Sequence, residues 1–454
     1  MKKGFTLIEL LAVIVILAII ALIATPIVLS IINDVKQSAL LRSSEYYITG
    51  IENSIMKKSM NTGTAYKPNV CIVYSNGDLL CDNEDILVVE VKGEKPTSGE
   101  ITFEEGKVAN INLKYPGATV TLNNKGELVL GEPEEEKVTL VNYIKNLYTP
   151  TTTTTVNDIE YDLDATNLLM NDRLGNSEVG KTDGNIRYYG ANPNNYIDIG
   201  DRDSEGNIIF WRIIGVFKDI EVTDKDGNVI KTEDLVKIIR ADYLALENIN
   251  KFSWDYTSMG EYDSNWHDST LQLMLNDEAN GYYGSGTTIY YNDSTTPTPL
   301  SFSSIGLSSK VHNKVERVKW SLGGHTNTSI YADVMYGYER AGTNIWSGKI
   351  ALMYPSDYGY SADLSSCQTT LYEFNNSTCT TANWMHDLAK GQWTLIPNTS
   401  STYRVFIVCS NGSVDSGYRA NLAYGIRPVL YLNSEVSIVE EKETSEGLKY
   451  FVVE

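Results

Sequence analysis

Apolar residues are concentrated at the beginning of the chain. From Leu10 to Ala24 every residue is apolar, and the apolar character resumes after a Thr-Pro step and continues to Ile32. Phe5–Ile32 comprises 28 residues. A helix of this length extends roughly 42 Å at about 1.5 Å per residue, which is enough to cross a bilayer. Lys2 and Lys3 precede the run, so the positive-inside rule predicts a cytoplasmic N-terminus and an exported remainder.

The helix is predicted to continue beyond the apolar run, to about residue 60. Roughly helical spacing relates Ile31, Val35, Ala39, Arg42, Tyr46 and Ile51, while the residues after Ile32 turn polar. We therefore expect one stem helix over residues 5–60. Its first part, 5–32, is the predicted transmembrane segment, and its amphipathic remainder is expected to pack on a globular domain.

Short strands separated by turns follow over residues 61–132. Val70–Tyr74 and Leu79–Leu80 flank Ser75-Asn76-Gly77-Asp78, a sequence typical of a hairpin turn. Further short apolar stretches alternate with Gly and Asn turns, which predicts a small antiparallel sheet. An acidic segment after Gly131 and the run Thr151–Thr155 then indicate domain boundaries, so residues 133–182 are expected to form a linker or spacer. Within this range Val138–Tyr148 is compatible with a short helix.

Composition adds two constraints. The chain has 454 residues, 37 of them basic and 58 acidic, with a formal charge of −21. This length predicts two or three domains, and the acidic balance disfavours nucleic acid as a partner. From about residue 183 the sequence becomes rich in aromatic residues, Gly and Asn. We expect a large, mainly β domain over 183–435, a closing strand or tail over 436–454, and an α+β fold for the whole chain.

One acidic residue interrupts the apolar N-terminal segment. At Glu9 an unpaired carboxylate in lipid costs on the order of 2.5–3.5 kcal/mol, so it needs a specific partner. An ordinary secretory signal, cleaved for example after Ala24, has no use for this residue, and neither has a plain membrane anchor. Residues 2–10, Lys-Lys-Gly-Phe-Thr-Leu-Ile-Glu-Leu, followed by an apolar helix, closely resemble the type IV prepilin signal.

The resemblance to type IV prepilins implies processing and assembly roles. A prepilin peptidase would remove the leader, residues 1–4, by cutting after Gly4, and the new terminal residue, Phe5, would be N-methylated. The Glu9 carboxylate would pair with the terminal amine of a neighbouring subunit, because the two charges offset each other's cost in lipid. A proline in mid-helix breaks one backbone hydrogen bond, and pilin helices kink or locally melt at such a position. The expected assembly residues are Glu9, Thr6 and Pro26.

The large C-terminal region carries three motifs: a Trp-Arg strand at Trp211-Arg212, a helix from Trp266 to Asn276, and a Gly-x-Arg-Pro strand at 425–428. Their order resembles a domain common on surface proteins of Gram-positive bacteria, with the C-type-lectin-like fold shared with sulfatase-modifying factors. The catalytic cysteine pair of those factors has no counterpart, because Cys409 stands alone. Aromatic residues over Tyr354–Tyr360 are suited to stacking on sugar rings or, equally, to a core.

Five cysteines are present, and export permits disulfides. Cys71 and Cys81 bracket the Asn-Gly hairpin, and Cys367 and Cys379 bracket a loop rich in Ser, Thr and Asn. Each pair is expected to form a disulfide. No Cys-x-x-Cys motif is present and the four histidines are scattered, so neither a metal site nor a cofactor is expected.

The function expected from these features is that of a structural subunit of a type IV pilus-like filament. Identical or related subunits, a prepilin peptidase, an assembly platform and its ATPase would be partners. The C-terminal module would serve adhesion to a host or surface glycan or protein. The precursor would lie in the cytoplasmic membrane and the mature subunit at the cell surface. The alternative is a minor pseudopilin of a type II secretion or DNA-uptake machine. A tethered enzyme is disfavoured because no Gly-x-Ser-x-Gly, His-Glu-x-x-His or phosphate-loop motif is present.

Overall fold

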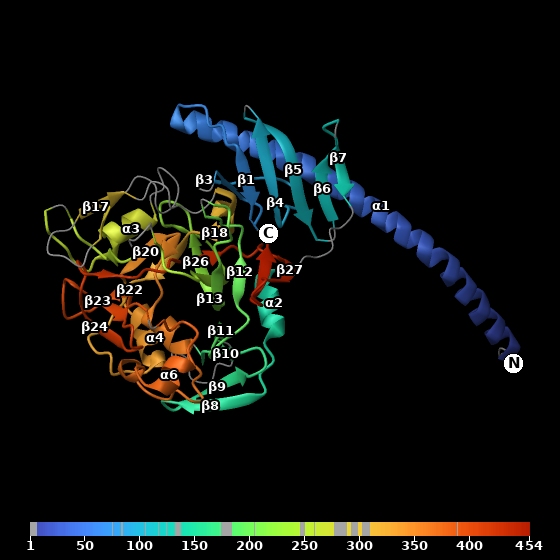
Figure 1. The fold of residues 1–454 in the computed structure, drawn as a ribbon. Coiled ribbons are helices and arrows are strands. Elements are labelled where there is room, and N and C mark those ends of the chain that lie inside the picture. The colour runs from blue at the N-terminus through green and yellow to red at the C-terminus, as the bar shows by residue number, and fades with distance from the viewer. Residues whose placement is uncertain are drawn as a thin grey trace. The chain divides into compact units, whose positions relative to one another are not determined.

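The computed structural model describes residues 7–454 except 75, 83–84, 105, 117, 124, 132–137, 174–183, 204, 246–249, 258, 277–287, 292–297, 302–308 and 388. For residues 7–34, 85, 288–291, 298–301 and 309–310 it describes the backbone alone. The chain divides into two compact units, Met1–Glu136 and Lys137–Glu454 (Figure 1). Each unit is described by itself below.

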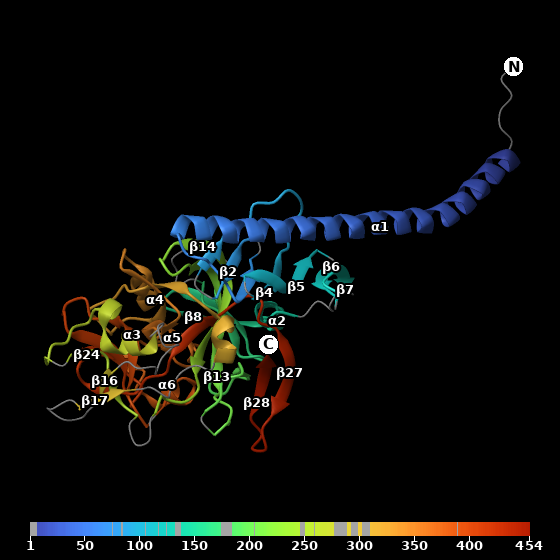
Figure 2. The same cartoon turned by 90° about the horizontal axis from the view of Figure 1, so that it is seen from above.

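The first unit is a long helix on an antiparallel sheet. Helix α1 spans Leu7–Thr62, and the sheet has seven strands in the order β3-β2-β1-β4-β5-β6-β7. Figures 1 and 2 show α1 running across one face of this sheet. The strands are β1 Val70–Val73, β2 Leu79–Cys81, β3 Asp85–Leu87, β4 Ser98–Glu104, β5 Lys107–Tyr115, β6 Ala118–Leu122 and β7 Leu128–Gly131.

One side of the second half of α1 holds the helix on the sheet. Tyr47 and Ile51 are fully buried with apolar residues of the strands. The Tyr47 hydroxyl donates to the Gly77 carbonyl at 2.8 Å, and the Ser44 hydroxyl donates to the Tyr115 hydroxyl oxygen at 2.9 Å. At Gly50 a β-carbon would lie 2.4 Å from a methyl group of Val91, so the close approach of helix and neighbouring segment needs glycine.

The predicted stem helix and the first hairpin both correspond to elements of the structure. α1 extends to Thr62, and β1 pairs with β2 so that Cys71 lies opposite Cys81. Residues 5 and 6 of the predicted helix, and the side chains of its predicted transmembrane part, lie outside the description. Among the described residues no helix is long and apolar enough to cross a membrane.

The second unit is built on a 14-stranded mixed sheet with the main strand order β18-β26-β14-β13-β11-β10-β9-β8. The strands of this main order are β8 Thr152–Val156, β9 Ile159–Asp164, β10 Leu169–Asn171, β11 Ile186–Tyr188, β13 Trp211–Thr223, β14 Val229–Arg240, β18 Val315–Glu316 and β26 Val429–Leu432. Joined to them are β12 Tyr196–Asp198, β19 Val318–Ser321, β20 Ile345–Gly348, β21 Ile350–Ala351, β27 Ile438–Glu443 and β28 Lys449–Val453.

Smaller elements complete the second unit. Its described α-helices are α2 Leu140–Leu147, α3 Thr270–Leu275, α4 Ala332–Arg340, α5 Pro355–Tyr360 and α6 Ser377–Thr381, and its short 3-10 helices are Trp266–Asp268, Ser309–Lys314 and Leu371–Glu373. Three small sheets pair β15 Phe252–Ser253 with β25 Ala423–Tyr424, β16 Thr288–Tyr291 with β17 Thr298–Ser301, and β22 Gln392–Pro397 with β23 Arg404–Val408 and β24 Val414–Arg419.

The long hairpin of β13 and β14 forms the centre of the second unit. Its paired apolar residues, such as Ile213 opposite Ile238, are fully buried. At Gly215 a β-carbon would lie 2.1 Å from the Ile186 carbonyl oxygen of β11, so only glycine permits this strand spacing. The structure therefore confirms a mixed fold with mostly β structure after an N-terminal helix.

The structure differs from the expectation of a spacer over residues 133–182. The short helix expected over 138–148 corresponds to α2, but β8–β10 also lie in this range and join the large sheet. The Thr-rich β8 pairs with β9 through Asn157 and Asp158, whose φ angles of 50° and 62° suit a tight hairpin turn. Threonine is β-branched and suits an extended strand, and the alternate residues Thr154 and Val156 are buried against the core. The remainder of the range, 174–182, lies outside the description.

The expected C-terminal tail is a hairpin. β27 and β28 pair antiparallel, and β28 also pairs in parallel with β12. The last residues of the chain therefore extend the large sheet.

Candidate functional site

The predicted processing and assembly residues lie at the edge of the described structure. Gly4, Phe5 and Thr6 lie outside the described residues. The backbone of Glu9 and Pro26 is part of α1, which continues through both positions. Their side chains are not described, so the structure does not test their predicted roles.

On the exposed side of α1, over residues 35–62, four large apolar residues lie among polar ones such as Arg42, Thr49 and Asn53. Val35, Tyr46, Met56 and Met60 are 59–78 % exposed. At about 100° per residue these four positions fall on one side of the helix, opposite the buried side that contains Tyr47. These four apolar side chains do not pack on the sheet of their own unit, so this exposed apolar side is available to other helices.

Four of the five cysteines form two disulfides. Cys71 bonds to Cys81 across β1 and β2, and Cys367 bonds to Cys379 at α6. Cys409 is free and partly buried, and burial raises the pKa of its thiol. Among the described residues no group of His, Cys, Asp and Glu could hold a metal ion.

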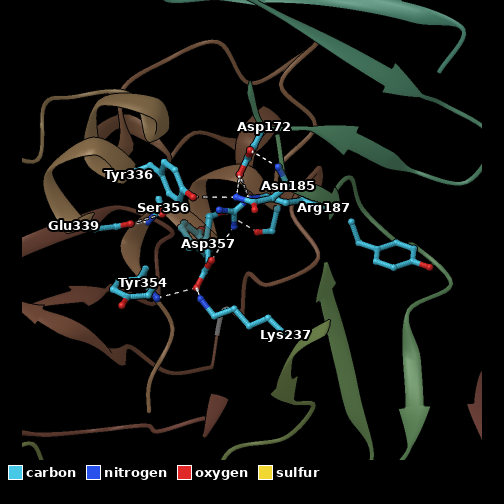
Figure 3. A network of polar contacts seen from close by, with 12 residues as sticks. Asp172, Asn185, Arg187, Lys237, Tyr336, Glu339, Tyr354, Ser356 and Asp357 are labelled. Atoms are coloured by element: carbon cyan, nitrogen blue, oxygen red, sulfur yellow. Dashed lines mark hydrogen bonds and ion pairs between the residues drawn. The ribbon is translucent and has the colours of Figure 1, made fainter. Parts of the chain in front are cut away.

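A network of charged side chains lies inside the second unit (Figure 3). Arg187 of β11 donates through Nε to Asp172 Oδ2 at 2.6 Å and through Nη1 to Asp357 Oδ1 at 2.8 Å. Lys237 of β14 donates through Nζ to Asp357 Oδ2 at 2.5 Å. All four side chains are at most 1 % exposed. Two cations and two carboxylates thus balance each other away from water.

Hydrogen bonds from the surrounding chain complete this network. Asn185 donates to Asp172 through its backbone N at 2.9 Å and its side-chain Nδ2 at 2.8 Å. The backbone N of Tyr354 donates to Asp357 Oδ2 at 3.0 Å. Because buried charges are tolerated only when they are paired and hydrogen-bonded, these contacts fix β11, β14 and α5 relative to one another.

Aromatic rings surround both cations. The Arg187 guanidinium lies 4.4 Å from the ring centroid of Phe217 and 4.8 Å from that of Tyr360. The Lys237 Nζ lies 4.5 Å from the centroid of Tyr354 and 4.9 Å from that of Phe217. Tyr358 and Tyr360 are fully buried, so they form part of the core and cannot stack on a sugar.

The environment shifts the pKa values of the network in different directions. Burial lowers the pKa of Lys237, although the Asp357 carboxylate opposes this effect. Burial acts to raise the pKa of Asp357, but the Lys237 and Arg187 cations outweigh it and keep this pKa below its ordinary value. Burial raises the pKa of Glu339 from 4.5 to about 7. Both oxygens of Glu339 contact Ser356, the neighbour of Asp357.

The arginines of the Trp-Arg and Gly-x-Arg-Pro motifs, Arg212 and Arg427, hold a loop of the second unit by hydrogen bonds to its backbone. Arg212 donates to the Trp384 carbonyl at 3.1 Å, and Arg427 donates to the Met385 carbonyl at 2.8 Å. Burial lowers the pKa of Arg212 to about 10. The two guanidinium groups therefore attach consecutive carbonyls of one loop to the strand of Arg212 and to the segment of Arg427.

The sequence does not predict that the charged residues of the network converge. The available signal is a single cation within an apolar strand, as with Arg187 between Ile186 and Tyr188 or Lys237 between Val236 and Ile238. A charge in such a position must find a partner inside the fold, but its identity depends on tertiary structure.

The comparison with known families found a match for the N-terminal segment. Residues 1–25 match the family described as the prokaryotic N-terminal methylation motif. The chain carries a prepilin-type motif. This supports a type IV pilin-like or pseudopilin subunit, with pilin subunits and a prepilin peptidase as partners, and it is consistent with a membrane-anchored precursor that becomes surface-exposed. No curated protein and no solved structure matches the chain.

Proposed function

We propose that this pilin-like chain is a structural subunit of a type IV pilus-like extracellular filament. It is cleaved after Gly4, methylated on Phe5 and assembled through α1 with identical or related subunits. An assembly platform and its ATPase drive this step. The observation that carries the proposal is the exposed apolar side of α1, on the same helix that begins with the methylation motif.

The exposed side of α1 has the properties of an assembly surface. Its members include two methionines, whose flexible side chains adapt to a neighbouring helix. Burial of one such side chain contributes about 1.5–3 kcal/mol. Repeated along a stack of helices, these contacts supply an apolar filament core without any cofactor.

We assign the second unit a display role, with adhesion to a glycan or protein as its function and a C-type-lectin-like layout as its fold. The charged network has no exposed side chain among Arg187, Lys237, Asp172 and Asp357. A substrate in solution cannot reach these groups, which supports a non-enzymatic module. The two disulfides suit an exported protein.

A minor pseudopilin is the second candidate. The second unit is more than twice as long as the first, and a bulky subunit suits the tip of a short filament better than its shaft. Filaments labelled with antibody along their whole length would favour a major subunit. Label confined to the tip would favour the pseudopilin of a secretion or DNA-uptake machine.

Met56→Lys is expected to reduce assembly without unfolding the subunit. The substitution places a charge on the exposed apolar side of α1, where Met56 is 60 % exposed in the isolated subunit. The loss of about 1.5–3 kcal/mol of burial in the filament corresponds to roughly a 10- to 100-fold weaker association. The measurement is the fraction of subunit recovered with sheared filaments.

Asn61→Lys is the matched control for this experiment. It adds the same charge at an exposed position of the same helix, five residues further on and therefore roughly 140° around the axis. The control should assemble normally, and both variants should keep the wild-type thermal unfolding midpoint. Equal filament yields from Met56→Lys and Asn61→Lys would show that the exposed apolar side has no role in assembly.

A further inference from the structure

We propose that Lys237 and Asp357 are joined in the mature protein by an amide bond between Nζ and Cγ. The two residues lie 120 positions apart in the sequence, yet Nζ of Lys237 is 2.5 Å from Oδ2 of Asp357. Their side chains are 0 % and 1 % exposed. An amine and a carboxyl group are therefore held in contact in an enclosed site, which is the arrangement that an intramolecular condensation needs.

Burial of Lys237 acts towards a neutral, nucleophilic amine, against the attraction of the Asp357 carboxylate for the ammonium. The rings of Tyr354, Phe217, Trp320 and Tyr431 lie 4.5–5.8 Å from Nζ. Such an apolar shell excludes water and destabilises charged groups. Transfer of one proton from Nζ to Oδ2 along the existing hydrogen bond converts the ion pair into a neutral amine and a neutral carboxylic acid.

The bond-forming step is balanced without any external reagent. Nζ attacks Cγ of Asp357, and the negative charge that develops on Oδ1 faces the Arg187 guanidinium, whose Nη1 lies 2.8 Å away. Pre-positioned cations of this kind stabilise a developing oxyanion. The protonated Oδ2 then takes a second proton from the nitrogen and leaves as water. The Nζ–Cγ bond forms, the Cγ–Oδ2 bond breaks, and nothing is oxidised or reduced.

The product leaves a balanced core. The amide removes one cation and one anion together, while Arg187 keeps its ion pair with Asp172 at 2.6 Å. Oδ1 of the former carboxylate remains an acceptor for Arg187. The new bond ties β14 to α5 through the centre of the second unit. In a subunit that is displayed on a filament and pulled by whatever it binds, such a bond limits extension of the chain.

The test is the intact mass of the purified full chain, denatured and with its disulfides reduced. The wild-type chain is expected to be lighter than its processed sequence by one water molecule. Lys237→Arg, prepared identically, is expected to show the full mass of its own sequence. Proteolysis of the wild type should yield a branched peptide that contains both Lys237 and Asp357.

Asp357→Asn gives a second, independent readout. Condensation with an asparagine side chain releases ammonia in place of water, so this variant should be lighter than its sequence by one ammonia molecule. A wild-type chain at full mass without a branched peptide would overturn the proposal. Loss of water located in any other peptide would overturn it equally. Neither result depends on whether the chain forms filaments.

Discussion

Glu9→Ala is expected to leave cleavage after Gly4 intact and to lower the recovery of subunit in filaments on the order of 100-fold. The terminal amine of a neighbouring subunit would lose its carboxylate partner in an apolar core. An unpaired charge there costs about 2.5–3.5 kcal/mol, and each 1.4 kcal/mol corresponds to about tenfold in association. The measurement is a quantitative immunoblot of sheared filaments against membranes.

Glu104→Ala is the control for the Glu9 experiment. Glu104 is an exposed acidic residue of β4, outside α1, and its replacement should leave filament recovery at the wild-type level. A Glu9→Ala strain with wild-type recovery would show that the carboxylate has no part in subunit docking.

Glu339→Gln is expected to remove a pH-dependent loss of stability from the second unit. Burial raises the pKa of Glu339 from 4.5 to about 7, so the folded state binds this proton more tightly than the unfolded state does. The stabilisation is complete below pH 4.5 and is lost as the pH rises through about 7. A shift of this size corresponds to about 3 kcal/mol. The Gln variant stays neutral and should keep its stability across that range.

Urea unfolding at several pH values measures this difference. All seven tryptophans lie within Lys137–Glu454, so their fluorescence reports on the second unit. Wild type should lose about 3 kcal/mol relative to Glu339→Gln between pH 4.5 and about 7. Glu446→Gln, which replaces an exposed carboxylate, should follow the wild-type curve. Parallel curves for wild type and Glu339→Gln would contradict the assigned role of Glu339.

Local patterns predicted much of the fold. Helical periodicity located the helix that the structure gives as Leu7–Thr62, and the Asn-Gly turn located the β1–β2 hairpin. The run Thr151–Thr155 predicts a spacer because threonine is polar and the segment is repetitive. In the structure β8 covers Thr152–Val156 and pairs with β9. A strand with one face open to water needs only one apolar side, and in β8 only Thr154 and Val156 are buried.

The charged network could not be predicted from any local pattern. Arg187 and Asp357 are separated by 170 positions, and Lys237 and Asp357 by 120. A pairing over such distances depends on the order of strands in the large sheet, which hydrophobic periodicity does not specify. The candidate residues at the N-terminus, in contrast, belong to a local motif within residues 1–25, so the sequence alone is enough to predict them.

The central claim is that the chain is processed as a prepilin before it enters a filament. The most direct measurement is the mass of the N-terminal peptide of the mature protein, taken from the cell-surface fraction. The account predicts a peptide that begins with Phe5 and carries one methyl group on its amine. A peptide that begins with an intact Met1, or one produced by cleavage after Ala24, would contradict it.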